Sequence, residues 1–322
     1  MTKSRRQLRA WPLFLLFTAA VHAQPFPNKP IRMIAPFPPG GEIDLVARGI
    51  GAKMAESIGQ PVVVENVAGA AGAIGSERVA KAAPDGYTLL LGATTTHGIN
   101  PALNPKLPYD AVKDFTPISL VTTIPHVLVV HPSVPVNTLA EFVQLAKAKP
   151  GMPYGSAGNG SPHHLAGALF SSLAGFNATH VPYKGVGPSM VDLLGGQISF
   201  MSVGATAADP YIKSGKLRAL ALAAPARLSG LDVPTFSEQG YKGFEIMAWY
   251  AVFAPAGLSA DLTNRLSAEV AKATNSPDFR ERLKSLGATP VGSSSQELGV
   301  HVRNEIDRWS RAGKAANFKM EQ

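Results

Sequence analysis

The chain has 322 residues, of which 45% are hydrophobic and none is cysteine, and its formal net charge is +8. The lack of cysteine excludes disulfides, thiolate nucleophiles and cysteine-ligated metal sites. The length and the hydrophobic content are sufficient to build a core, and we expect two domains.

The first 23 residues have the pattern of a cleaved signal peptide. Four basic residues lie between positions 3 and 9, an apolar stretch follows from 11 to 21, and the sequence Val-His-Ala at 21–23 fits a small-x-small cleavage site. The apolar stretch is too short to span a membrane. We therefore expect export to the periplasm, by the Sec route in preference to the twin-arginine route, and a mature chain that begins at Gln24.

Removal of this segment lowers the formal net charge to +4, because it holds four basic and no acidic residues. The remaining chain has no dense run of lysine and arginine with interleaved aromatic residues. Nucleic acid is therefore not an expected partner. The mild positive charge is compatible with a small anionic ligand.

The stretch from Pro36 to Asp44 is expected to join a strand to a helix. The apolar run 31–35 predicts a short buried strand, three prolines end it, and Gly40 and Gly41 open a helical pattern. Such a turn leaves several backbone N–H groups unpaired, and their partial positive charge suits a carboxylate or phosphate. A plain strand-to-helix connection is the alternative interpretation.

Strands and helices continue to alternate after this turn. Strands are predicted at 62–66 and 87–91, with a helix of small residues between them and a Pro-Asp-Gly turn at 84–86. This alternation favours a parallel α/β sheet.

A second copy of the same order follows further along the chain. Its predicted elements are a strand at 127–130, a helix at 139–148, a glycine-rich turn at 154–161, a helix at 162–173, a strand and loop at 180–185, a helix at 190–194 and a strand at 198–203. Because the order of elements matches that of the first half, we infer two similar α/β lobes.

The last segment is expected to close the molecule. It is predicted to contain a strand at 217–223, a short helix behind Pro234, a strand at 249–254 that crosses back to the first lobe, and helices at 260–274, 277–286 and 296–312. Arg303, Glu305 and Arg308 are interpreted as a solvated helix face.

Six segments, in this order, resemble one known family. They are NKPIRMIAPFPPGGEIDLVAR, GQPVVVENVAGAAGAIGSERVAKAAPDGYTLLLG, LPYDAVKDFTPISL, YGSAGNGSPHHLAGALF, HVPYKGVGPSMVDLLGGQISF and VPTFSEQGYKGFE. The chain resembles the Bug family of extracytoplasmic solute receptors of tripartite tricarboxylate transporters. The resemblance implies an α/β, two-lobe, periplasmic-binding-protein-like fold of type II, with each lobe a sheet flanked by helices and the ligand cleft between the lobes.

The resemblance also implies a function. The chain is expected to be a monomeric periplasmic receptor that captures a small carboxylate-bearing molecule, needs no cofactor or metal, and delivers its ligand to the membrane subunits of the transporter. The first lobe would comprise 24–122 plus 236–322, and the second lobe 123–235. The ligand loops of the family correspond to 37–41 and 155–161. A ligand sensor for a signalling partner is an alternative role.

The residues predicted to bind the ligand lie at the ends of strands and in the two loops. In the first lobe they are Phe37, Pro38, Pro39, Gly40, Gly41, Asn66, Thr94 and Thr95. In the second lobe they are Ser156, Ala157, Gly158, Ser161, His164, Tyr183, Gly185, Gly204, Ala205 and Thr206. Short side chains at 156–158 would let a ligand approach the backbone. For the asparagine and the threonines, turn formation and capping are alternatives.

Two histidines beside the second loop are adjacent in the sequence. His163 and His164 cannot share a helix face, so a metal pair is not expected there. For His164, packing is favoured over lining the cleft.

Three acidic residues need separate interpretations. Asp44 is expected to bind a backbone N–H at the start of its own helix in preference to a ligand. Glu42 stands where the family commonly has a small residue. Because a carboxylate in the cleft would repel an anion, we expect its side chain to point outward, or to act as a first-turn residue favoured by the helix dipole. An inward side chain would favour a ligand with an amino group. Asp209 stands where apolar residues are common in the family, and its role is open.

Enzymatic motifs are poorly matched. The sequence Gly-Ser-Ala-Gly at 155–158 is not a G-x-S-x-G nucleophile elbow. Dinucleotide-binding and P-loop motifs are absent from the sequence. The remaining enzymatic alternative is an exported serine hydrolase of the α/β type that uses Ser156 with His164, and we expect the chain not to be an enzyme.

Overall fold

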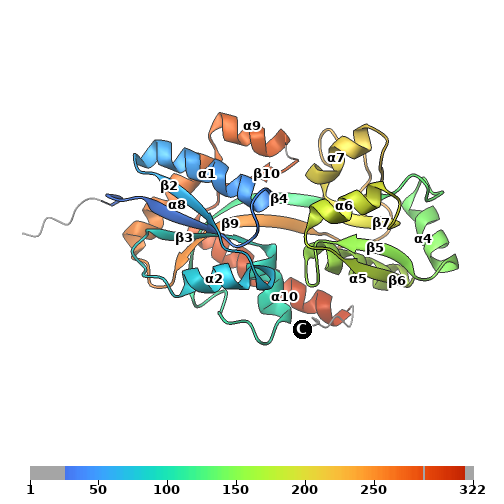
Figure 1. Ribbon diagram of the computed structural model, residues 1–322, viewed down its shortest axis with the longest axis horizontal. Coiled ribbons are helices and arrows are strands. Elements are labelled where there is room, and N and C mark those ends of the chain that lie inside the picture. Colours follow the sequence, from blue (N-terminus) through green and yellow to red (C-terminus); the bar gives the residue numbers. More distant parts are fainter. Residues whose placement is uncertain (1–25, 286, 316–322) are drawn as a thin grey trace, which may run out of the picture.

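The computed structural model describes residues 26–285 and 287–315, which form two lobes on one continuous sheet (Figure 1). The strands follow the order β2-β1-β3-β9-β4-β7-β5-β6, and β8 and β10 also pair with β4. The predicted signal peptide at 1–23 lies outside the described residues. None of the described helices combines the length and the apolar character that crossing a membrane requires.

The first lobe is built on the parallel strands β1 (Ile31–Ala35), β2 (Val62–Asn66) and β3 (Thr88–Ala93). Its sheet is mixed rather than parallel as predicted, because β9 (Met247–Pro255) returns from the second lobe and pairs antiparallel with β3. The other elements are α1 (Glu42–Ile58), η1 (Ala70–Gly72), α2 (Ala73–Ala80), η2 (Thr95–Ile99), α3 (Asn100–Leu103), α8 (Ala260–Thr274), α9 (Pro277–Ser285) and β10 (Thr289–Pro290).

The second lobe repeats this arrangement. In the first lobe β1 lies between β2 and β3, and in the second lobe β5 (Met152–Ser156) lies between β6 (Ala178–Pro182) and β7 (Phe200–Gly204), again in parallel. The further elements are α4 (Leu139–Ala148), α5 (Pro162–Ala174), α6 (Val186–Leu194), α7 (Ala205–Lys213) and β8 (Arg218–Ala223). The strand pairing agrees with the predicted similarity of the two halves, but the counterpart of β1 is β5, of which 154–156 is predicted as part of a glycine-rich turn.

One long strand, β4 (Phe115–Val130), joins the lobes. The sequence predicts only 127–130 as a strand, whereas β4 has 16 residues. Its first part pairs with β9 and β10, and its second part pairs with β7 and β8. The register with β9 shifts after Pro117, which has no N–H to donate to the ladder. The proposed lobe boundary at 122–123 falls inside this strand.

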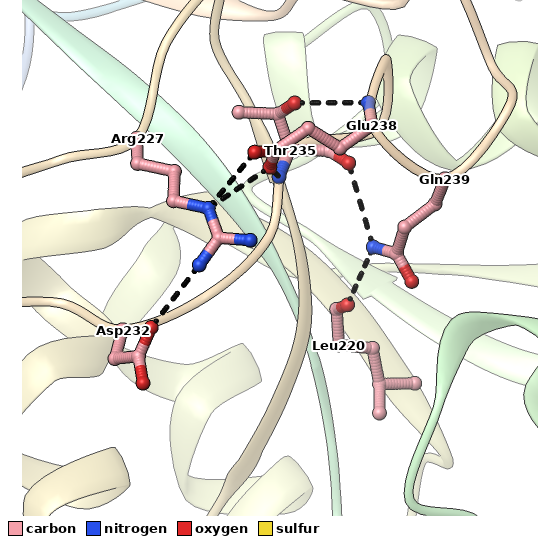
Figure 2. A network of polar contacts seen from close by, with 6 residues as sticks. All are labelled: Leu220, Arg227, Asp232, Thr235, Glu238 and Gln239. Carbon is pink, nitrogen blue, oxygen red and sulfur yellow. Dashed lines mark hydrogen bonds and ion pairs between the residues drawn. The ribbon is translucent and has the colours of Figure 1, made fainter.

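The segment after Pro234 forms a turn rather than the predicted short helix. The backbone N–H of Thr235 donates to Glu238 Oε2 at 2.6 Å, and the backbone N–H of Glu238 donates to Thr235 Oγ1 at 3.1 Å. Arg227 pairs with the carboxylate of Glu238 (Figure 2). Because Thr235 also forms a parallel bridge to β8, the chain is held extended at the point where the helix would begin.

The helix α10 (Ser295–Ala315) runs along both lobes (Figure 1). It carries a buried carboxylate, that of Glu305. Glu305 is only 6% exposed, so its predicted place on a solvated helix face is wrong. Its Oε2 accepts hydrogen bonds from Nε1 of Trp249 at 2.9 Å and from Nε1 of Trp309 at 3.0 Å. Arg308 is paired with the other oxygen at 3.0 Å. Trp309 packs in a core cluster of the second lobe, whereas Val302 packs in one of the first.

Candidate functional site

The first loop, Phe37–Gly41, connects β1 to α1 and is shaped by an aspartate. Gly41 is the N-cap of α1, and Gly40 has a φ of 84°, which a glycine adopts without strain. The backbone N–H of Gly40 donates to Asp44 Oδ2 at 3.0 Å. Asp44 therefore makes the helix-start bond that the sequence predicts.

Asp44 also ties the loop to the end of β2. Arg48 pairs with Asp44 Oδ1 at 2.9 Å, and Asn66 Nδ2 donates to the same oxygen at 3.0 Å and to the carbonyl oxygen of Phe37 at 3.1 Å. Burial alone would raise the pKa of Asp44, but the bonds from Arg48, Gly40 and Asn66 outweigh it and hold the pKa below its ordinary value. The amide of Asn66 supports the loop, as the turn-forming alternative predicts.

Glu42, the first residue of α1, points inward, so the predicted outward direction is wrong, whereas its predicted alternative place in the first turn of the helix is confirmed. The hydroxyl of Tyr250 in β9 donates to Glu42 Oε2 at 3.1 Å. Glu42 Oε1 lies 3.3 Å from the point that a Cβ on Gly204, at the end of β7, would occupy. Because Gly204 has no side chain, the carboxylate of Glu42 has room to approach the second lobe at this point. Burial raises the pKa of Glu42, and the bond from Tyr250 offsets part of this rise.

Of the three threonines after β3, two bind backbone groups through their side chains, and the third has no side-chain hydrogen bond with a described residue. Thr94 Oγ1 accepts from the backbone N–H of Trp249 at 2.7 Å, and Thr96 Oγ1 accepts from that of Ala93 at 2.9 Å. Thr95 makes no side-chain hydrogen bond with any of the described residues, although it is only 8% exposed. Since Ala93 pairs with Tyr250 in the sheet, these threonines lie beside the partner of Glu42.

The second loop follows β5 and is organised by a serine and two histidines. Ser156 Oγ shares a hydrogen bond of 2.6 Å with His180 Nε2 and accepts from the backbone N–H of Gly158 at 3.0 Å. The ring of His164 stacks on that of His180 with centroids 3.5 Å apart, as its predicted packing role requires. Burial lowers the pKa of His164 to about 3 and that of His180 to about 4. Both imidazoles are therefore neutral at neutral pH.

Other predicted residues around the second loop have structural roles in this conformation. Ser161 is the N-cap of α5 and accepts from the backbone N–H of His164 at 3.3 Å. The hydroxyl of Tyr183 donates to Asp192 at 2.6 Å. Gly158 and Gly185 have φ values of 119° and 129°, so a side chain at either position would strain the backbone.

A histidine pair connects the end of β7 with the second loop. Gly204 is the register partner of His126 in β4, and the ring of His126 lies 4.8 Å from that of His163 near the start of α5. Burial lowers the pKa of both histidines, that of His163 to about 4. The structure thus brings the start of α1, the end of β7 and the start of α5 together where the lobes meet.

The remaining residues at this junction belong to α7. Ala205 and Thr206 form its first turn, directly after the N-cap Gly204. Asp209 pairs with Lys213 one turn later at 2.7 Å, so its carboxylate serves a helix-surface ion pair. Within the described part of the chain, no group of three or more His, Asp or Glu residues could hold a metal ion.

Ser156 and His180 are the arrangement closest to a catalytic pair. The predicted partner, His164, stacks on His180 instead of bonding the serine. Among the described residues no carboxylate bonds the imidazole of His180, so the pair lacks the third group that orients a catalytic histidine. With its pKa lowered to about 4, His180 is also a weak base. The geometry suits fixed hydrogen bonding rather than nucleophilic attack.

Comparison with known proteins identifies the family. A family model described as the tripartite tricarboxylate transporter family receptor matches residues 46–318. The chain belongs to this receptor family. The resemblance to the Bug family is confirmed as well, because the receptor is 38% identical to BugT of Bordetella pertussis over 305 residues, which are 94% of each chain.

Solved structures agree with this membership. A Rhodopseudomonas palustris protein solved with adipate is 34% identical to the receptor, with a TM-score of 0.85 and coverage of 91% of this chain and 99% of that one. MatC from Rhodopseudomonas palustris, solved with bound malate, is 38% identical, with a TM-score of 0.81 and coverage of 89% and 99%. The family and its solved members are two-lobe solute-binding proteins rather than enzymes, which confirms the expected fold and class.

Sequence reasoning missed two residues of the candidate site. Tyr250 is 208 positions away from Glu42, and no local pattern indicates their contact. The sequence predicts His180 only as part of a strand. The register of Tyr154 with His180 in the parallel pair of β5 and β6 places His180 near the end of β5, and the sequence carries no signal of this pairing because 154–161 is predicted as a turn.

Proposed function

We propose that this receptor captures a small carboxylate-bearing ligand between its lobes in the periplasm and delivers it to the membrane subunits of a tripartite tricarboxylate transporter. We further propose that it acts as a monomer and that residues 1–23 direct its export by the Sec route. The observation that carries the proposal is the repeated placement of the loops. β1 and β5 each lie between two parallel strands of their lobe, and each ends in a glycine-containing loop that opens a helix.

The ligand carboxylate would bind to backbone N–H groups of these loops. Among the described residues, the N–H groups of Gly41 and Ala157 donate to no protein acceptor. A helix N-terminus contributes about 0.3–2 kcal/mol toward an anion, whereas a micromolar ligand needs about 8 kcal/mol. Direct hydrogen bonds and closure of the lobes therefore have to supply most of the binding free energy. The adipate and malate of the solved relatives support a carboxylate as the anionic group.

The experiment is a thermal-shift screen of the purified receptor with mono-, di- and tricarboxylates, aromatic acids and acidic amino acids. A ligand at about 100 times its Kd stabilises the folded state by about 2.7 kcal/mol, so we expect at least one acid to raise the Tm by about 5 °C or more. Uncharged diamides of the same length serve as controls and should leave the Tm unchanged. If no acid raises the Tm and mass spectrometry finds no co-purified ligand, the proposal is wrong.

A further inference from the structure

The carboxylate of Glu42 is the feature of the lobe junction that an anionic ligand does not explain. It belongs to the first turn of α1 in the first lobe and packs against Gly204 in the second. Tyr250 donates to Oε2, and among the described residues nothing donates to Oε1. A simple dicarboxylate held between the two loops would therefore bring further negative charge close to a carboxylate that is already half-buried.

No positive group of the described chain neutralises this carboxylate. Asp44, two residues later, is paired with Arg48, but no lysine, arginine or histidine of the described residues pairs with Glu42. The hydroxyl of Tyr250, which donates to it, is neutral at physiological pH, and burial keeps His126, the register partner of Gly204, neutral as well. A half-buried charge without an ionic partner is unfavourable, so the site has the electrostatics of a receptor for a cation at this point.

We propose that Glu42 binds a protonated nitrogen of the ligand, so that the receptor selects carboxylates that also carry a cationic group over plain carboxylates. The inference rests on the proposed function and names the ligand class for the same site. The N–H groups of the loops hold the carboxylate, and Glu42 holds the opposite charge of a zwitterion. Two features favour the ionised form of Glu42 for this role: its place at a helix N-terminus and the donated hydrogen bond from Tyr250.

The test compares acids that differ only in a protonated nitrogen. The pairs are glutamate with glutarate, γ-aminobutyrate with butyrate, and para-(aminomethyl)benzoate with para-methylbenzoate, measured by thermal shift and titration calorimetry. In at least one pair the amino acid should bind the wild-type receptor more tightly than its partner. The affinity of the Glu42→Gln variant for that amino acid should be about 30-fold or more lower than that of the wild type, because the loss of one member of a desolvated charge pair has that effect. The affinity of Glu42→Gln for the partner without nitrogen should stay the same or rise.

A matched control lies on the same helix. Glu56 near the end of α1 is exposed and pairs with Lys53, so Glu56→Gln should bind every acid as the wild type does. Two results would overturn the inference. One is equal affinity of Glu42→Gln and the wild type for the amino acids. The other is a wild-type affinity for the plain acids that matches or exceeds its affinity for their amino partners. Those results would leave the proposed function standing. If no acid binds either protein, the proposed function fails and this inference fails with it.

Discussion

Replacing Glu305 with alanine is expected to lower the free energy of unfolding by about 3 kcal/mol. The substitution leaves the indole N–H groups of Trp249 and Trp309 without their acceptor in a region where both rings are almost fully buried. It also removes the partner of Arg308. Because Trp249 belongs to β9 of the first lobe and Trp309 packs in the core of the second, the effect should extend to both lobes. Chemical denaturation measures the change.

The control for this prediction is Glu305→Gln. Both indoles donate to the same oxygen, Oε2, so the single carbonyl oxygen of glutamine can accept both bonds. The expected loss is about 1 kcal/mol, which reflects the weaker neutral acceptor and the lost pairing with Arg308. A loss below about 0.5 kcal/mol in Glu305→Ala, which is usual for surface substitutions, would contradict the assigned role of the carboxylate.

Local patterns in the sequence were sufficient for most of the elements. The apolar run 31–35 bounded by prolines corresponds to β1, and the glycines after it correspond to the start of α1. The matching order of the two halves follows from the same kind of pattern, because each strand, turn and helix is encoded over a few residues. The contacts that connect the lobes are not encoded in this way.

The two errors about acidic residues show why. The sequence predicts an outward Glu42 because a carboxylate in the cleft would repel an anion, and a solvated Glu305 because an isolated carboxylate is usually exposed. Their partners, Tyr250 and Trp249, are 208 and 56 positions away, and both lie in β9. The sequence predicts that β9 returns to the first lobe. The direction of each of its side chains, however, depends on the register in which β9 pairs with β3 and β4. No periodicity within α1 or α10 carries that information.

The interior of the first lobe and the candidate site are thus linked through one strand. Tyr250 faces the carboxylate of Glu42, and its neighbour Trp249 donates its indole N–H to Glu305 of α10. The backbone N–H of Trp249 donates a hydrogen bond to Thr94 Oγ1 at 2.7 Å, and this bond fixes β9 to the end of β3. The position of the tyrosine hydroxyl, and with it the direction of Glu42, therefore depends on the core behind β9.

Replacing Asp44 with alanine is expected to weaken both the fold and ligand binding. The aspartate is only 4% exposed and accepts bonds from the Gly40 N–H, Arg48 and Asn66. Loss of this acceptor should lower the free energy of unfolding by about 2 kcal/mol, and release of the loop should weaken binding of the best acid from the screen by about tenfold or more. Asp44→Asn keeps one acceptor oxygen and should lie between the alanine variant and the wild type.

The effect of Asp44 on stability should also depend on pH. Its pKa in the folded protein is lowered, so the stabilisation it provides is complete above the pKa of the unfolded chain, about 3.9, and is lost as the pH falls through the lower pKa of the folded state. The difference in unfolding free energy between Asp44→Ala and the wild type should therefore be constant from about pH 7 to about pH 5 and shrink below about pH 4. A difference that grows on acidification would show that the carboxylate is not held by Arg48 and Asn66. Unchanged binding by Asp44→Ala would show that the conformation of the first loop does not control the site.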